Sequence, residues 1–342
     1  MQLQQNVPLA IYSTMRLGGH AAYLLEVTDS QTLVEAVKMA QGYNLPVIIV
    51  GYGSNIIWRD EGFPGLVLVN RIAGFEITTQ DNQSAYITVG AGENWDSVVQ
   101  RTVEMGLSGI ECLSLIPGTA GATPIQNVGA YGQDISQVLM TLTAYDSKAK
   151  NMVTLKASDC NFNYRKSIFN TTEKGRYLIT SITLLLSKNS PMPPFYPAVT
   201  SYLEKHKITS YNPMALRQAV VDIRTSKLPD PNVIANSGSF FANPIVDRAI
   251  YYQLEEEYPN IPHWMTNEGQ VKLSAAWLID QVGFHDYFDE ETGMATWSLQ
   301  SLVFVNHSAK STTDLLKFAD KVKTKVKQIF NIDLVQEPLL IP

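Results

Sequence analysis

Several residue types that would indicate a particular class of protein are scarce in this chain of 342 residues. It has only two cysteines, Cys112 and Cys160, which excludes a disulfide framework and fits a reducing compartment. Its five histidines are scattered without the spacing of metal ligands, and no Cys-x-x-Cys pair occurs. We therefore expect no metal site.

Long apolar runs are also missing. No stretch approaches the ~18 apolar residues that cross a membrane, and no basic segment followed by an apolar one opens the chain. Acidic residues outnumber basic ones by 32 to 26, a formal net charge of -6. This balance argues against nucleic acid or an anionic membrane as partner. We expect a cytoplasmic monomer that acts on small molecules.

Residues 113–132 form the most informative segment, here called the glycine loop. It contains four glycines and two prolines and almost no charge, which suits neither a helix nor a solvated loop. Glycine lets backbone N–H groups approach a ligand closely, and successive N–H groups form a concavity for phosphate. An irregular buried loop that packs two elements together is the alternative.

A second glycine-rich segment, residues 50–55, directly follows the short apolar run 46–50, which is typical of a buried strand. Neither segment is a Gly-x-Gly-x-x-Gly turn opening a helix, and neither ends in Gly-Lys-Ser/Thr. A Gly-x-Ser-x-Gly elbow with plausible partners is also missing. The sequence thus predicts two ligand loops outside the common nucleotide signatures.

Hydrophobic periodicity predicts a mixed pattern of helices and strands. Helices are expected over 31–40, 95–105, 216–223, 272–281 and 311–329, and strands over 46–50, 66–69, 85–89, 177–186 and 302–305. The last helix opens with a capping box and is expected to bury Leu315, Ala319, Val322, Val326 and Ile329. Its lysine-rich opposite face is interpreted as solvated rather than as a nucleic-acid patch.

The two loops resemble, in this order, the FAD-binding elements of the UDP-N-acetylenolpyruvoylglucosamine reductase (MurB) family. Four further segments match the same family: 164–169, 224–231, 236–244 and 272–280. The matches run from about residue 13 to Glu337 and keep the family's order. One loop would be weak support, whereas six collinear motifs are strong support.

The resemblance implies an α+β fold. It implies a two-domain FAD-binding unit of the vanillyl-alcohol-oxidase-like type plus a third α+β substrate domain. The expected divisions are 1–70 and 71–220 for the two FAD-binding lobes and 221–342 for the substrate domain with its C-terminal catalytic segment.

The resemblance also implies FAD held without a covalent link and reduced by NADPH. The residues that match cofactor-binding positions are Gly51, Tyr52, Gly53, Ser54, Asn55, Ile116, Pro117, Gly118, Thr119, Gly121, Ala122, Gln126, Asn127, Gly129, Ala130, Tyr131 and Arg224.

Three residues match catalytic positions. Ser239 matches the proton donor, Arg165 the cation that polarises the substrate carboxylate, and Glu337 a carboxyl that assists enolate stabilisation. Flavin supplies hydride chemistry, so the protein must supply a cation and an acid. From the residues alone, Ser239 could cap a turn, Arg165 could form a structural ion pair, and Glu337 could be a solvated terminal residue.

Lys227, Asn243 and Lys272 match substrate-binding positions, and lysine suits a diphosphate. Ordinary surface lysines and a turn asparagine are the alternative. The insert 194–213 points to a longer subclass in which a tyrosine closes over the substrate. Tyr202 matches that tyrosine, with Tyr196 as rival.

The implied reaction is reduction of UDP-N-acetylglucosamine enolpyruvate to UDP-N-acetylmuramate in peptidoglycan precursor synthesis. Another oxidoreductase of the same flavin superfamily, such as an oxidase, and a nucleotide-sugar-binding protein that kept the fold are the alternatives. The chain departs from the family pattern at Ser13, Ala122, Ala242 and Trp297. Of these, Ala122 bears most on cofactor affinity, because it lies within the glycine loop.

Overall fold

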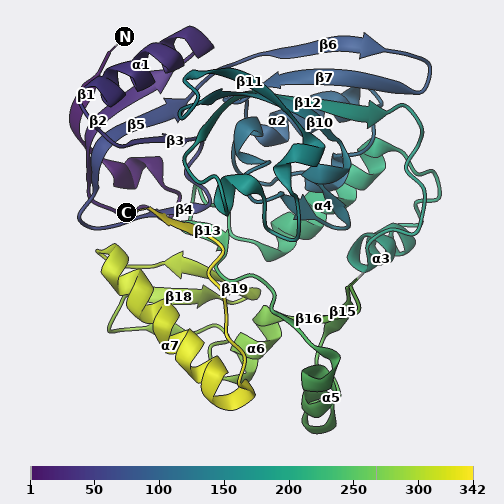
Figure 1. Ribbon diagram of the computed structural model, residues 1–342. Helices are drawn as coiled ribbons and strands as arrows, with labels where there is room; N and C mark the ends of the chain where they lie inside the picture. Colours follow the sequence, from purple (N-terminus) through teal and green to yellow (C-terminus); the bar gives the residue numbers. More distant parts are fainter. Residues whose placement is uncertain (1, 267, 342) are drawn as a thin grey trace. The chain divides into compact units, whose positions relative to one another are not determined.

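The computed structural model describes residues 2–266 and 268–341, and the chain divides into two compact units. The first unit is Met1–Val7, Ala21–Tyr52 and Pro64–Ser226. The second is Pro8–His20, Gly53–Phe63 and Lys227–Pro342. Figure 1 shows their elements, and each unit is described by itself. The division into domains 1–70, 71–220 and 221–342 stays a prediction.

The elements of the first unit alternate between sheet and helix. They are β1 (Gln4–Pro8), β2 (His20–Val27), α1 (Ser30–Gly42), β3 (Val47–Val50), β5 (Phe63–Asn70), β6 (Phe75–Gln80), β7 (Ser84–Gly90), α2 (Trp95–Glu104), β8 (Gly129–Ala130), β9 (Gln133–Asp134), β10 (Leu139–Asp146), β11 (Asn151–Lys156), β12 (Tyr177–Ser187), α3 (Pro197–Lys205) and α4 (Pro213–Lys227).

A four-stranded sheet in the order β1-β2-β5-β3 carries α1. β3 and β5 run parallel and are joined by residues 51–62, whereas α1 connects β2 to β3. Either Asp29 or Ser30 could cap α1 from the sequence, and the structure shows Asp29 as the cap, accepting the Thr32 N–H at 2.7 Å. Leu33 and Val37 on its inner face are buried against Leu66 and Leu68.

A five-stranded antiparallel sheet, β11-β10-β12-β7-β6, forms the larger part of the first unit. Its core of alternating apolar side chains includes Ile87, Leu142 and Ile182, with Trp95 and Val99 of α2 packed against them. The predicted strands 85–89 and 177–186 and the predicted helix 95–105 are confirmed within a few residues. This core supports the glycine loop, which leaves α2 through the short 3₁₀ helix Glu111–Leu113.

α3 and α4 share a smaller apolar cluster of Cys112, Val199, Leu203, Leu216 and Val220. Burial raises the pKa of the Cys112 thiol to about 12, and the pKa of the buried Cys160 to about 11. Both thiols are therefore protonated at neutral pH and act as packing groups. The insert 194–213 thus packs beside the start of the glycine loop rather than projecting from the unit.

The second unit contains two small antiparallel sheets and a parallel strand pair. Its elements are β4 (Ile56–Trp58), β13 (Asn236–Ser239), β14 (Ile245–Val246), α5 (Arg248–Glu257), β15 (His263–Met265), β16 (Val271–Leu273), α6 (Ala275–Gln281), β17 (Phe288–Asp289), β18 (Met294–Trp297), β19 (Gln300–Asn306), α7 (Thr312–Phe330) and β20 (Leu339–Ile341).

α7 is the longest helix of this unit and packs beside β18 and β19 (Figure 1). The predicted capping box is confirmed, with Ser311 and Asp314 satisfying each other's backbone N–H groups. Leu315, Ala319, Val322 and Val326 are buried as predicted.

The exposed face of α7 is solvated and carries ion pairs, as expected. Lys321 lies 2.9 Å from Asp289, and Lys327 lies 2.8 Å from Asp333. Acidic partners from neighbouring segments thus compensate part of the lysine charge.

Two sequence predictions for the second unit are wrong. The helix expected over 272–281 begins only at Ala275, because Lys272 and Leu273 belong to β16 and Ser274 caps the helix by accepting the Trp277 N–H. Ile329 is 51% exposed, and Phe318 and Phe330 fill the apolar face of α7 instead. The periodicity of a short segment could not distinguish a three-residue strand from a first helical turn.

The C-terminal strand fixes the early segment 53–63 within the second unit. β20 pairs in parallel with β4, and the Leu339 N–H donates to the Asn55 carbonyl at 2.9 Å. Asp60 accepts the Thr312 and Thr313 N–H groups at 2.6 and 2.8 Å, which caps α7 from a distant part of the chain.

Candidate functional site

The glycine loop is shaped by residues in the left-handed region of backbone space. Gly118 has a φ of 145°, and the non-glycine residues Leu115, Asn127 and Tyr131 have φ values of 54°, 48° and 48°. Non-glycine residues adopt such angles at a cost of about 1–3 kcal/mol, and they persist where surrounding contacts fix them. This concentration of strained backbone marks the loop as a functional segment.

The start of α2 holds the middle of the glycine loop. The Trp95 N–H donates to the Gly118 carbonyl at 3.1 Å, and the Ala120 N–H donates to the Glu93 carbonyl at 2.9 Å. The Trp95 indole also donates to the Leu113 carbonyl at 3.1 Å. Backbone hydrogen bonds and the Trp95 indole thus set the position of the loop backbone, while Leu113 and Ala120 anchor the loop in the core of the large sheet.

Within the first unit, the start of the glycine-rich segment 50–55 meets the glycine loop at Gly51 and Thr119. A Cβ on Gly51 would overlap the Thr119 side chain, and one on Gly121 would overlap Ala91. Only glycine allows these close approaches. Ala122 is tolerated because it lies in the 3₁₀ turn Ala120–Ala122, with its N–H on the Thr119 carbonyl at 3.0 Å.

The donors of these segments fit a flavin dinucleotide better than a metal. They are backbone groups, hydroxyls and amides, which suit phosphate and ring edges. In the first unit, the Nε of Arg224 is one of the buried polar atoms that have no hydrogen-bond partner within residues 2–266 and 268–341, which fits a group that binds a ligand. No cluster of His, Cys, Asp and Glu among these residues could hold a metal ion.

Arg165 lies beside the far end of the glycine loop. It occupies the left-handed corner of a tight turn closed by Asn163 and Lys166, and its Nη2 donates to the Gly129 carbonyl at 2.8 Å. A Cβ on Gly129 would lie 2.8 Å from the Asp134 Cβ and 3.4 Å from the Arg165 guanidinium. The glycine therefore allows the close approach of Asp134, whereas the Arg165 guanidinium would lie at ordinary contact distance from a Cβ.

The side chain of Asn127 supports the glycine loop from within by hydrogen-bonding to two neighbouring segments. Its side chain accepts the Ser136 N–H at 3.0 Å and donates to the Asn163 carbonyl at 3.3 Å. These contacts tie the glycine loop to the turn that carries Arg165. Its predicted cofactor contact stays a prediction.

Ser239 ends β13 immediately after a bulge in the pairing with β19. The bulge needs Gly238, which has a φ of 71°, and a Cβ on that glycine would meet open space. The hydroxyl of Ser239 makes no hydrogen bond to another described side chain or backbone group of the chain, so it is available to a ligand. Phe240 and Phe241 behind it are fully buried and fix the strand.

Glu337 lies next to this strand in the second unit. Its N–H donates to the Phe240 carbonyl at 2.9 Å, and the Ala242 N–H donates to the Val335 carbonyl at 2.9 Å. The C-terminal segment therefore pairs with the residues that follow Ser239. Glu337 is partly buried, so it is not an ordinary solvated terminal residue.

The predicted substrate-binding residues of the second unit lie on separate elements. Lys227 ends α4, and its carbonyl accepts the Trp297 indole N–H at 2.9 Å. Asn243 accepts the Ala275 N–H at 3.0 Å, and the Lys272 Nζ lies 5.6 Å from the Trp264 ring centre. The side chain of Asn243 thus also supports the start of α6.

The structure distinguishes the two candidate tyrosines of the insert. Tyr202 is on α3, donates to Asp222 and stacks on His206 at 4.2 Å. Tyr196 precedes α3 and contacts Tyr131 of the glycine loop edge to face, with ring centres 5.6 Å apart. Tyr196, rather than Tyr202, therefore lies against a predicted cofactor-binding residue.

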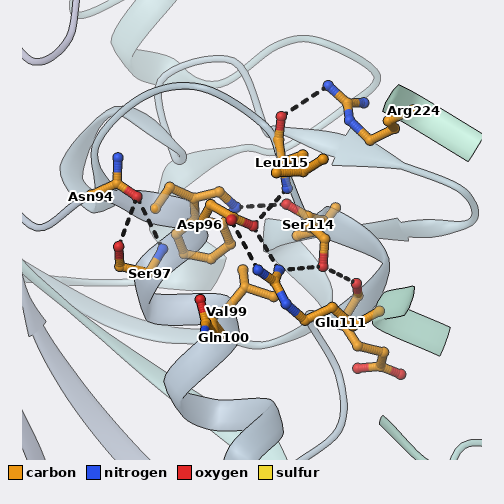
Figure 2. A network of polar contacts seen from close by, with 12 residues as sticks. Asn94, Asp96, Ser97, Val99, Gln100, Glu111, Ser114, Leu115 and Arg224 are labelled. Carbon is orange, nitrogen blue, oxygen red and sulfur yellow. Dashed lines mark hydrogen bonds and ion pairs between the residues drawn. The ribbon is translucent and has the colours of Figure 1, made fainter. Parts of the chain in front are cut away.

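Asp96 and Arg217 are polar residues that sequence reasoning missed. They form a two-pronged ion pair of 2.6 and 2.9 Å beside the start of the glycine loop, within the network of polar contacts drawn in Figure 2. They are 121 positions apart, so no local pattern could reveal the pair. Burial raises the pKa of Asp96, but hydrogen bonds from Arg217 and Leu115 outweigh it and hold that pKa below its usual range.

Arg224, predicted to bind the cofactor, belongs to the same network. Its Nη2 donates to the Leu115 carbonyl at 3.2 Å. Burial lowers the pKa of its guanidinium, and the neighbouring Tyr131 and Asp96 oppose that effect. The first unit thus contains the glycine loop, Arg165 and Arg224, and the second contains Ser239, Glu337, Lys227, Asn243 and Lys272.

Comparisons with known proteins match two different family models to the earlier and later parts of the chain. A family model described as an FAD binding domain matches residues 21–151, and one described as the UDP-N-acetylenolpyruvoylglucosamine reductase C-terminal domain matches residues 230–341. Proteins named UDP-N-acetylenolpyruvoylglucosamine reductase from Chromobacterium violaceum and Amoebophilus asiaticus are 35% and 38% identical. Each comparison covers 100% of this chain and 99% or 100% of the relative.

A crystal structure of the reductase from Thermus caldophilus has the same fold, with a TM-score of 0.68, 22% identity and complete coverage of both chains. The predicted α+β fold with an FAD-binding part is confirmed, and so is FAD as cofactor. No helix of the described residues is long and apolar enough to cross a membrane. The chain belongs to the UDP-N-acetylenolpyruvoylglucosamine reductase family.

Proposed function

We propose that this protein uses NADPH to reduce UDP-N-acetylglucosamine enolpyruvate to UDP-N-acetylmuramate, a step of peptidoglycan precursor synthesis. The observation that carries the proposal is the Ser239 hydroxyl. It follows a glycine bulge, makes no hydrogen bond to another described residue, and directly precedes the residues that pair with the Glu337 segment. An FAD-binding protein that only stored a nucleotide sugar would not need an acid so placed.

The reaction needs one hydride and one proton for the carbon–carbon double bond of the enolpyruvyl ether. Bound FAD supplies the hydride chemistry, and NADPH replenishes it. Addition to one carbon leaves negative charge on the carboxylate side of the substrate. Arg165 is proposed to neutralise that charge, and guanidinium suits a planar carboxylate.

Ser239 is proposed to give its proton to the neighbouring carbon and to regain one from solvent. A free serine is a weak acid, so the transfer requires a polarising environment. Glu337 is proposed to supply part of that environment through its carboxyl. The strand pairing between Phe240 and Glu337 supports this assignment.

Substrate binding is assigned to Lys227, Asn243 and Lys272, since two lysines suit the charge of a diphosphate. For the tyrosine that closes over the substrate we favour Tyr196, because its ring contacts Tyr131 of the glycine loop. A monomer in the cytoplasm, acting without nucleic acid or membrane, remains the prediction from composition.

Product analysis tests the proposal directly. Purified protein is incubated with NADPH and UDP-N-acetylglucosamine enolpyruvate without oxygen, and the UDP-sugar is identified by mass spectrometry. Formation of UDP-N-acetylmuramate with equal consumption of NADPH supports the proposal. An oxidase would instead consume oxygen and form peroxide, and a binding protein would leave both small molecules unchanged.

A further inference from the structure

Leu115 opens the cofactor-binding part of the glycine loop in a strained conformation. Its φ of 54° is uncommon for a side chain with a Cβ. The side chain is 36% exposed, so packing does not explain why the angle is kept. Such backbone persists where other contacts determine it.

Charged side chains hold both backbone groups of Leu115 (Figure 2). Its N–H donates to Asp96 Oδ1 at 2.7 Å, and its carbonyl accepts from Arg224 Nη2 at 3.2 Å. Asp96 is in the first turn of α2, and Arg224 is on α4. Two helices therefore fix the peptide groups on either side of one strained residue.

Arg217 fixes Asp96 in turn. The guanidinium contacts both carboxylate oxygens of Asp96, at 2.6 and 2.9 Å, and its Nη1 also contacts Ser114 Oγ at 2.8 Å. The side chains of Arg217 and Asp96 are only 12% and 24% exposed, so solvent screens the pair weakly. Ser114 is fully buried and donates to the Glu111 carbonyl at 2.6 Å.

The same helix start and the residue before its cap hold the loop again at Gly118 and Ala120, three and five residues after Leu115. Backbone hydrogen bonds join Trp95 to Gly118 and Glu93 to Ala120. Ile116 and Pro117 thus lie between two sets of contacts, one at Leu115 and one at Gly118 and Ala120. Loss of the Asp96 contact would remove one of the two charged groups that hold Leu115 and leave the second set in place.

We propose that Asp96 and Arg217 are positioning residues for FAD, acting through Leu115 on the backbone of Ile116 to Thr119. The inference rests on the proposed function, since it takes the glycine loop as the cofactor site. Neither side chain is assigned a contact with the cofactor or the substrate. They hold the loop in its binding conformation before FAD arrives, so less conformational entropy is lost when FAD binds.

FAD affinity of the purified full-length protein tests the inference. The variants are Arg217→Met, Asp96→Asn, the double variant and Arg217→Lys, and the fluorescence of released flavin is followed on dilution. The unfolding temperature is measured with saturating FAD. Arg176→Met is the matched control, because Arg176 forms a similar fork with Asp146, at 2.6 and 3.0 Å, in the same unit and away from the glycine loop.

We expect both single variants to bind FAD roughly 10- to 100-fold more weakly, and the double variant no more weakly than the worse single one, since the two side chains act as one device. Arg217→Lys should recover only part of the affinity, because lysine lacks the fork. The control should lower the unfolding temperature and keep the wild-type FAD affinity.

The inference would be overturned if Arg217→Met and Asp96→Asn bound FAD with wild-type affinity while their unfolding temperatures fell as much as that of the control. If Arg217→Met does not fold, Arg217→Lys and Asp96→Asn decide by the same criterion. A wild-type protein that binds no FAD would instead refute the proposed function and this inference with it.

Discussion

The glycine loop and the Ser239 strand are built in opposite ways. In the glycine loop, which we propose binds the cofactor through its backbone, side chains from α2 and α4 hold Leu115 in a strained conformation. In the Ser239 strand the backbone is ordinary antiparallel sheet after one bulge, and a single hydroxyl is left unengaged by other described residues. The first arrangement suits binding of a large cofactor, and the second suits one chemical step.

This difference predicts separable defects. Changes that disturb the glycine loop should lower cofactor affinity, whatever the substrate. Changes in the Ser239 strand and its partner segment should leave cofactor binding intact and slow the step that uses the substrate. The following predictions, in order of expected effect, test whether the two regions can be separated in this way.

Ser239→Ala should slow reoxidation of the reduced flavin by substrate by about 10²–10⁴-fold, the range for loss of a general acid. Reduction by NADPH should be unchanged, because it needs no substrate proton. Rapid mixing measures the two half-reactions separately. An equal loss in both would make Ser239 a structural or cofactor-binding residue.

Arg165→Met should lower turnover by about 10²–10³-fold, as expected for a preorganised charge at a developing oxyanion. The effect on turnover should exceed that on substrate binding, since the charge it meets grows in the transition state. Lys166→Met, one residue away and exposed, is the charge-matched control. Weakened FAD binding with intact substrate turnover would assign Arg165 to the glycine loop, through its bond to Gly129, instead.

Gly51→Ala should weaken FAD binding by roughly 10- to 100-fold, because the added Cβ overlaps Thr119 and overpacking costs about 1–3 kcal/mol. Thr119→Ala in the same chain should recover part of the loss. Gly42→Ala in α1 is the control, because a Cβ added at Gly42 would have no other atom within 4 Å. If flavin titration gives Gly51→Ala the same FAD affinity as wild type, the close approach of Gly51 to Thr119 does not matter for FAD binding.

Glu337→Gln should slow substrate-driven reoxidation by about tenfold, the difference between a hydrogen bond to a charged group and one to a neutral group. FAD affinity should not change. Single-turnover reoxidation at the wild-type rate would show that the carboxyl has no part in the reaction, and the Arg165 assignment would stand without it.

The smallest effect concerns stability in acid. Hydrogen bonds from Arg176 lower the pKa of Asp146 to about 2, from an ordinary value of 3.8. The resulting stability, roughly 1–2 kcal/mol, is therefore fully present above pH 4 and lost as the pH falls towards 2. Arg176→Met should make the free energy of unfolding depend less on pH between about pH 4 and pH 2. An unchanged pH dependence would show that Arg176 does not lower the pKa of Asp146.

Local signals made much of this molecule predictable from its sequence. The Asp29 cap, the Ser311 capping box and the alternation along β12 each act within a few residues, and all three are present. The composition of the glycine loop also indicated a ligand. These features follow from backbone geometry that neighbouring residues determine.

Long-range pairings were not predictable in the same way. The Asp96–Arg217 pair, the pairing of β4 with β20 and the Asp60 cap of α7 join residues more than 100 positions apart. Nothing in the local sequence marks either partner. The position of Tyr196 against Tyr131 likewise depends on how the insert packs, which the spacing of its residues left open.

Anaerobic reoxidation of the wild-type flavin is the most direct test of the account. The protein is reduced with one equivalent of NADPH without oxygen and then mixed with UDP-N-acetylglucosamine enolpyruvate. We predict that the oxidised flavin spectrum returns in a single turnover as UDP-N-acetylmuramate forms. A flavin that stays reduced with this substrate and is reoxidised only when oxygen is admitted would contradict it.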